Sequence, residues 1–98
     1  MWIGWMELDL LLGDVHSLKE KRSFVRPLIS ELRRRFELSV AEVDYLDLHR
    51  RVMVGVSVVA SERVHIVEVL DRVEHFVAAR PEFEFLSAHR GFATSDDE

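Results

Sequence analysis

The first segment of the chain alternates between apolar and acidic residues. Within residues 2–12, the even positions from Met6 to Leu12 are all apolar, and two of the odd positions between them are acidic. A period of two with one apolar side is typical of a strand that buries one face. Gly13 and Asp14 then indicate a turn, so we expect the strand to end before them.

The next segment has the spacing of an amphipathic helix. Its apolar residues recur at intervals of three, four and seven, and at about 100° per residue they fall on one stripe. These residues are Leu18, Val25, Leu28, Ile29, Leu32 and Phe36. Ser17 and Glu20 match the capping-box pattern, which predicts a helix start at Ser17. Because proline lacks the N–H that a helix interior uses, Pro27 predicts one helix with a kink, with two shorter helices as the alternative.

The rest of the chain predicts three strands and a second helix. The predicted strands are Leu38–Asp44, residues 51–60 and Phe83–Ala88. The middle strand has valine at every even position from Val52 to Val58, and β-branched side chains favour a pleated surface. The second amphipathic helix follows Ser61, whose hydroxyl suits a cap, and ends before Pro81, because the residue preceding a proline disfavours helical geometry.

The predicted order, strand–helix–strand–strand–helix–strand, is that of the ferredoxin-like α+β fold. This fold has a four-stranded antiparallel sheet with both helices on one face. We therefore expect the even-numbered residues of the first and third strands to lie beneath the helices. The chain of 98 residues has room for one domain, which we place at residues 1–92, followed by a disordered acidic tail at residues 93–98.

Composition argues against several classes of function. The absence of cysteine excludes disulfides, thiolate metal sites and cysteine nucleophiles. The histidines show no metal-site spacing, and the four glycines form no phosphate-binding loop. The histidines are His16, His49, His65, His75 and His89. We therefore expect a non-enzymatic protein without a metal or a small-molecule cofactor.

The start of the chain lacks the basic region of a signal peptide, and Glu7 and Asp9 interrupt its apolar run. No uninterrupted apolar stretch approaches the roughly 20 residues that a membrane span needs. We therefore expect a cytoplasmic protein that does not contact a membrane.

Positive charge is concentrated in the first predicted helix. The whole chain has a net charge of −5, yet the segment between His16 and Phe36 contains seven basic and two acidic residues. On a helical wheel, four of the basic residues lie within about 60° of one another. Such a stripe suits the phosphate backbone of RNA, and the alternative is a solvated helix face. The candidate RNA-binding residues, including two from the third strand region, are Lys19, Lys21, Arg22, Arg26, Arg33, Arg34, Arg50 and Arg51.

Three carboxylates form a second candidate site. Glu42 and Asp44 are two residues apart on a predicted strand and are therefore expected to share a face, and Asp47 follows closely. Paired carboxylates suit acid–base chemistry or magnesium binding. The alternative is surface charge that discourages pairing at the edge of the sheet.

The sheet face without helices is a third candidate. We expect it to present Trp5, Met53 and Val59, with Phe83 or Phe85 as a further aromatic residue. Some ferredoxin-like sheets stack RNA bases on such aromatics, but the motif of those proteins is absent from the third strand. An exposed apolar sheet face also marks subunit contacts, so we expect a homodimer through this face.

Two blocks of the sequence closely resemble the YlxP-like family of small bacterial proteins. The blocks are SLKEKRS at residues 17–23 and RRRFELSVAEVD at residues 33–44. Gly4 and the strand that contains Gly55 also match, and the resemblance covers roughly residues 1–78. His49 stands where many members carry tryptophan.

The resemblance implies a ferredoxin-like fold and a family of unknown function without assigned catalytic residues. Genes of the family commonly lie beside those for a translation initiation factor and a ribosome-binding factor, which implies a role around ribosomal RNA or a ribosomal particle. We therefore expect an RNA- or ribosome-associated accessory protein that contacts the phosphate backbone through its first helix. The first alternative is a dimeric protein-interaction module that uses the open sheet face, and the second is a small-molecule enzyme or sensor built on the three carboxylates.

Overall fold

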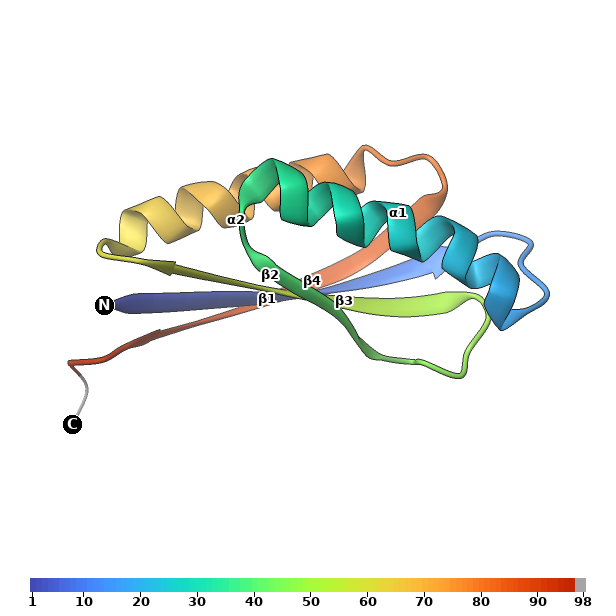
Figure 1. Ribbon diagram of the computed structural model, residues 1–98, viewed down its shortest axis with the longest axis horizontal. Coiled ribbons are helices and arrows are strands. Elements are labelled where there is room, and N and C mark those ends of the chain that lie inside the picture. The colour runs from blue at the N-terminus through green and yellow to red at the C-terminus, as the bar shows by residue number, and fades with distance from the viewer. Residues whose placement is uncertain (97–98) are drawn as a thin grey trace.

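A computed structural model describes residues 1–96 and has the predicted order of elements. The strands are β1 (Trp2–Leu12), β2 (Ser39–Asp44), β3 (Arg51–Ala60) and β4 (Phe83–Thr94), and the helices are α1 (Leu18–Phe36) and α2 (Arg63–Ala78). All strand pairs are antiparallel, in the order β2-β3-β1-β4. Both helices cover one face of the sheet and leave the other face open (Figure 1). The structure therefore confirms the ferredoxin-like α+β fold.

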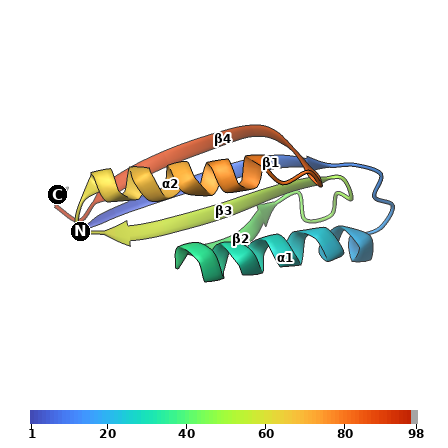
Figure 2. The ribbon, with the colours of Figure 1, turned by 90° about the horizontal axis from the view of Figure 1, so that it is seen from above.

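The two helices run in opposite directions and cover different parts of the sheet. Seen from above, α2 lies over β1 and beside β4, whereas α1 lies beside β2 (Figure 2). This arrangement places α1 at the outer flank of the domain, with one side against the core and the others toward solvent. Among the described residues, neither helix is long and apolar enough to span a membrane.

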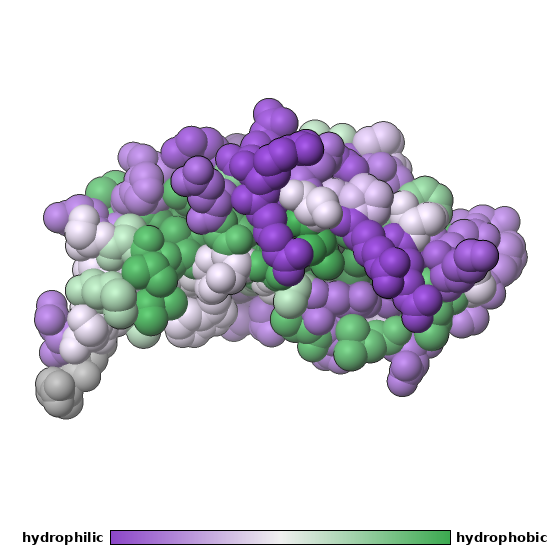
Figure 3. Space-filling model, in the orientation of Figure 1, coloured by the Kyte–Doolittle hydropathy of each residue, from purple (hydrophilic) through white to green (hydrophobic). Residues whose placement is uncertain are grey.

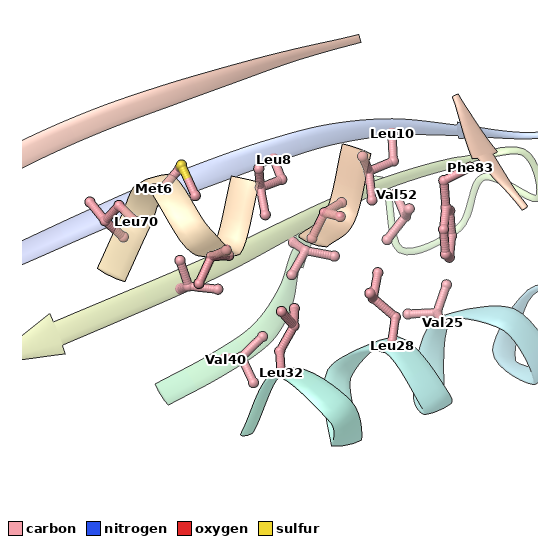
Figure 4. Close-up of a cluster of buried hydrophobic side chains, with 14 of the residues drawn as sticks. Met6, Leu8, Leu10, Val25, Leu28, Leu32, Val40, Val52, Leu70 and Phe83 are labelled. Atoms are coloured by element: carbon pink, nitrogen blue, oxygen red, sulfur yellow. The ribbon is translucent and has the colours of Figure 1, made fainter. Parts of the chain in front are cut away.

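The core lies between the sheet and the helices (Figure 4). As predicted, the even-numbered residues of β1 and β3 form its floor, and Met6, Leu8 and Val54 are fully buried. The apolar stripes of the helices complete it. The largest fully buried side chains include Met6, Leu8, Leu10, Leu12, Leu28, Leu32, Ile66 and Leu70. Since each such side chain stabilises the fold by about 1.5–3 kcal/mol, this layer fixes which strand face meets the helices.

The start of α1 follows the predicted cap in part. The Ser17 hydroxyl accepts a hydrogen bond from the Glu20 backbone N–H at 3.0 Å. Within residues 1–96, the Glu20 side chain makes no return bond to Ser17, so only half of the capping box forms.

α1 continues through Pro27 as one helix, and the prediction of two shorter helices is wrong. Ser23, whose carbonyl would accept from position 27, is exposed, so water can satisfy that carbonyl.

Two predicted boundaries need correction. α2 begins at Arg63 after Glu62, and Glu62 makes no side-chain capping bond, so Ser61 lies one residue too early to cap the helix. β4 continues to Thr94 rather than ending at Ala88, because the long β1 supplies pairing partners as far as its first residues. Ala93 and Thr94 therefore belong to the sheet and not to a tail. The last two residues of the predicted disordered tail, 97 and 98, lie outside the described residues.

Candidate nucleic-acid interface

One flank of α1 carries a group of exposed basic side chains, which we call the α1 basic surface. Its members are Lys19, Arg22, Arg26, Arg33 and Arg34. Strongly hydrophilic side chains gather over α1 in the space-filling view (Figure 3). Lys19, Arg22 and Arg26 also line a shallow hollow of about 530 Å³ with Ser23 and Pro27. The helical spacing thus places three cationic groups around one concave surface.

One of the two acidic residues of α1 is neutralised by a partner outside the helix. Glu31 forms an ion pair with Arg80 from the segment after α2. Within residues 1–96, no ion pair involves Lys19, Arg22 or Arg26. The flank of α1 therefore stays positive although the whole chain has a net charge of −5.

Arg33 is held in place by the neighbouring strand. Its Nη2 donates to the backbone carbonyl of Val40 on β2 at 2.9 Å, and the residue is exposed. This bond orders the guanidinium near the C-terminal end of α1, where positive charge also complements the helix dipole.

Lys21 does not belong to the α1 basic surface. It is only 2% exposed, and its Nζ lies 2.8 Å from Glu42 Oε2 and donates to the Tyr45 carbonyl at 2.8 Å. The predicted contact of Lys21 with phosphate is therefore wrong, because the ammonium points into the gap between α1 and β2. Glu42 Oε2 is buried and accepts no hydrogen bond from the described residues, so the contact with Lys21 is one of charge. This pair joins the two blocks that carry the family resemblance.

The two arginines predicted to support the α1 basic surface have other partners. Arg50 Nε donates to the carbonyls of Leu12 and Gly13 at the end of β1. Arg51 lies on the open sheet face, forms two 2.7 Å hydrogen bonds to Asp9 and stacks over Tyr45. These bonds hold the pKa of the Asp9 carboxyl below its ordinary value. Arg51 therefore does not extend the α1 basic surface, since the sheet separates the two.

The predicted carboxylate pair does not form. A register shift in β2 places Glu42 opposite Val54 and Asp44 opposite Met53, which lie on opposite faces of β3. The strand alternation that predicted a shared face is broken by this irregularity. Glu42 then faces Lys21, whereas Asp44 accepts from the Tyr45 N–H at 2.7 Å. In the described part of the chain, no three His, Asp or Glu side chains gather in a way that could hold a metal ion.

The open sheet face presents only some of the predicted aromatic residues. Trp5 is 39% exposed and borders a hollow of about 360 Å³, which Val43 and Gly55 also line. The Trp5 indole lies against Gly91 on β4, where any Cβ would overlap it. Phe83 points into the core beneath the helices (Figure 4). Phe85 pairs with the core residue Leu10 of β1, so the prediction that either phenylalanine lies on the open face is wrong.

The connection between β2 and β3 exposes two apolar residues that are not among the candidate site residues predicted from the sequence. Leu46 is 59% exposed and Leu48 is 49% exposed. The signal was present in the sequence, since these two leucines flank Asp47 in a short connection and do not join a buried stripe.

The fold and the exposed residues together define a ferredoxin-like α+β domain with a basic helix flank and an open sheet face. The chain belongs to DUF503, a family described as a protein of unknown function, whose model matches residues 3–90. It is 34% identical over 82 residues to the uncharacterized protein YlxP of Bacillus subtilis (strain 168), covering 84% of this chain and 89% of that protein. The YlxP-like resemblance is thereby confirmed.

Two solved structures of designed proteins share the fold. The de novo designed protein Foldit4 superposes with a TM-score of 0.55 at 9% identity, covering 96% of this chain and 98% of that one. The de novo designed protein LFR1 1, described as having a ferredoxin fold, gives a TM-score of 0.53 at 15% identity, covering 98% of this chain and 88% of that one. At these identities the likeness concerns the fold alone.

Proposed function

We propose that this protein is a non-enzymatic accessory protein that binds RNA through the α1 basic surface, in the ribosomal setting that the family resemblance implies. The observation that carries the proposal is the hollow bordered by Lys19, Arg22 and Arg26, whose positive charges have no acidic partner within residues 1–96. Unpaired cations on a helix flank attract a phosphate backbone and position it without selecting a base sequence. Selectivity then comes from RNA shape or from a second contact.

The five members of the α1 basic surface set the expected salt dependence. If each contacts one phosphate, the logarithm of the binding constant falls by about 3.5–4.5 for each tenfold rise in salt. Between 50 and 300 mM salt, affinity then falls by about a thousandfold. Cosedimentation with purified ribosomal particles at these two salt concentrations measures this change.

The variant Arg22→Gln/Arg26→Gln tests the surface directly. Removal of two phosphate contacts lowers the salt slope by about 1.4–1.8 and weakens binding about a hundredfold at 50 mM salt. The matched control is Arg63→Gln/Arg72→Gln, which removes two exposed arginines from α2 and changes the net charge equally. The proposal predicts near wild-type binding for this control. Equal losses for both pairs, or no binding of the wild type at 50 mM salt, would contradict it.

A second candidate function is protein interaction through the open sheet face, where the sequence predicts homodimerisation. It is favoured by the exposure of Trp5, at 39%, and Val43, at 48%, on either side of the hollow on this face. Apolar side chains gathered around a hollow on one face are typical of a binding surface. Sedimentation equilibrium over micromolar concentrations tests the dimer, since one chain mass throughout would contradict self-association.

A further inference from the structure

A hollow on the helix side of the domain lies where the end of α1 meets α2. Its volume is about 340 Å³, and it is lined by Arg35, Phe36, Arg72, His75 and Phe76. The first two of these residues end α1, and the other three lie in the second half of α2. The lining therefore combines two aromatic rings with three basic side chains, and no described residue that lines it is acidic.

The two rings form a fixed surface for stacking. Phe36 and Phe76 meet edge to face with their centroids 5.7 Å apart, and both residues are half-buried against the core. The Arg35 guanidinium lies 5.0 Å from the centroid of the Phe76 ring. Aromatic rings and guanidinium planes are the groups on which proteins stack the bases of nucleotides.

The charge of the hollow is positive. Arg35 and Arg72 are exposed and form no ion pair within residues 1–96. Arg80 also lies near the Phe76 ring, but two glutamates neutralise it and it does not line the hollow. Glu68 precedes Arg72 by one helical turn, yet it lies outside the lining. An anion in the hollow therefore meets two arginines that no carboxylate of the described chain neutralises.

The hollow is separate from the α1 basic surface. Arg33 donates to the Val40 carbonyl on β2, whereas Arg35 lies over Phe76 on α2. These two arginines therefore point to opposite flanks of α1, and an RNA backbone that follows the α1 basic surface passes on the other side of the helix. The volume of the hollow is at the lower end of the range for small-molecule sites, which suits one nucleotide rather than a strand.

We propose that this hollow binds a free nucleoside phosphate. The base stacks on the surface formed by Phe36, Phe76 and the Arg35 guanidinium, and the phosphate pairs with Arg72. Arg72 precedes Phe76 by one helical turn, about 6 Å along α2, so a phosphate one sugar away from the stacked base reaches it. The proposal adds a ligand-binding site to the protein and is independent of RNA binding by α1.

NMR titration of the isotope-labelled protein with AMP tests the proposal. AMP represents the class, because stacking on aromatic rings does not select a base. We expect saturable shifts, at millimolar AMP, in the backbone amide signals of the lining residues and their neighbours. Adenosine lacks the phosphate and inorganic phosphate lacks the base, so each alone should bind at least about tenfold more weakly than AMP. No shifts, shifts elsewhere in the chain, or equal binding of either fragment would overturn the proposal.

One variant and its control make the test specific to the site. Arg72→Gln removes the phosphate contact and should weaken AMP binding at least about tenfold. The matched control, Arg63→Gln, removes another exposed arginine from α2 and should bind AMP as the wild type does. Both side chains are exposed, so an unchanged melting temperature shows that each variant is folded. Equal weakening by the two variants would contradict the assignment of Arg72.

Two competing ligands distinguish the nucleotide from other occupants. A single-stranded RNA oligonucleotide that shifts the same amide signals at lower concentrations than AMP would assign the hollow to RNA. A peptide of alternating glutamate and phenylalanine that does so would assign it to an acidic protein partner. Either result would overturn the proposal of a free nucleotide, whereas weaker binding of both competitors than of AMP supports it.

Discussion

The buried pair of Lys21 and Glu42 predicts how the free energy of unfolding changes when one or both of its charges are removed. Lys21 is 2% exposed and its Nζ lies 2.8 Å from Glu42 Oε2, while the Glu42 side chain is 22% exposed. At this distance the gross attraction of the two charges is about 6 kcal/mol with an effective dielectric constant of 20. Desolvation of both groups offsets most of that attraction, so the pair stabilises the fold weakly relative to an apolar pair of the same size.

Removal of one partner lowers the free energy of unfolding much more than removal of both partners together. Glu42→Gln leaves the buried ammonium without its counter-charge, which costs about 3–5 kcal/mol at a fully buried site. Because water reaches Glu42, we expect the lower end, about 3 kcal/mol, and a melting temperature about 12–24 °C lower for a domain of this size. By contrast, Lys21→Met/Glu42→Leu removes both charges and should lie within about 1 kcal/mol of the wild type or be more stable.

Urea unfolding followed by circular dichroism measures these free energies, since a single domain of 98 residues suits a two-state treatment. The matched control is Glu7→Gln, which removes an exposed carboxylate from the other face of the same sheet and should change the free energy of unfolding by less than about 0.5 kcal/mol. A loss below about 1 kcal/mol for Glu42→Gln would refute the argument. Lys21 would then be solvated in the folded protein and would belong with the α1 basic surface.

Two further predictions concern the sheet. The Arg51 bonds hold the pKa of Asp9 below its ordinary value of 3.8, so their stabilisation is complete above that pH and is lost as the pH falls through the lower pKa of the folded state. Asp9→Asn should therefore lower the free energy of unfolding at pH 7. In urea titrations at about pH 2.5, the difference between Asp9→Asn and the wild type should be smaller than at pH 7. An equal difference at the two pH values would contradict the ion pair. Gly4→Ala should cost about 1–3 kcal/mol, because its Cβ would overlap a fully buried isoleucine of α2. Gly13→Ala is the control in the same urea assay, since nothing lies within 4 Å of a Cβ there, and equal losses for both variants would count against the tight packing of β1 under α2.

Hydrophobic periodicity by itself determined the order of the elements and the buried face of each. Alternation at Met6 and Leu8 identified the core side of β1, and the three-and-four spacing through Leu28 and Leu32 identified that of α1. These signals are local, because a strand repeats every two residues and a helix every 3.6. The same helical period also predicted which flank of α1 carries its arginines.

Only the tertiary structure decided which charged residues face solvent. Lysine side chains usually lie at the surface. The Lys21 side chain is buried instead, because it contacts Glu42 and the Tyr45 carbonyl, which lie more than 20 positions away in the sequence. Likewise, the register shift before Asp44 and the continuation of β4 depend on neighbouring strands. Local spacing specifies the face of an isolated element, whereas burial of a charge and the length of a strand depend on partners that are distant in the sequence and meet only in the folded chain.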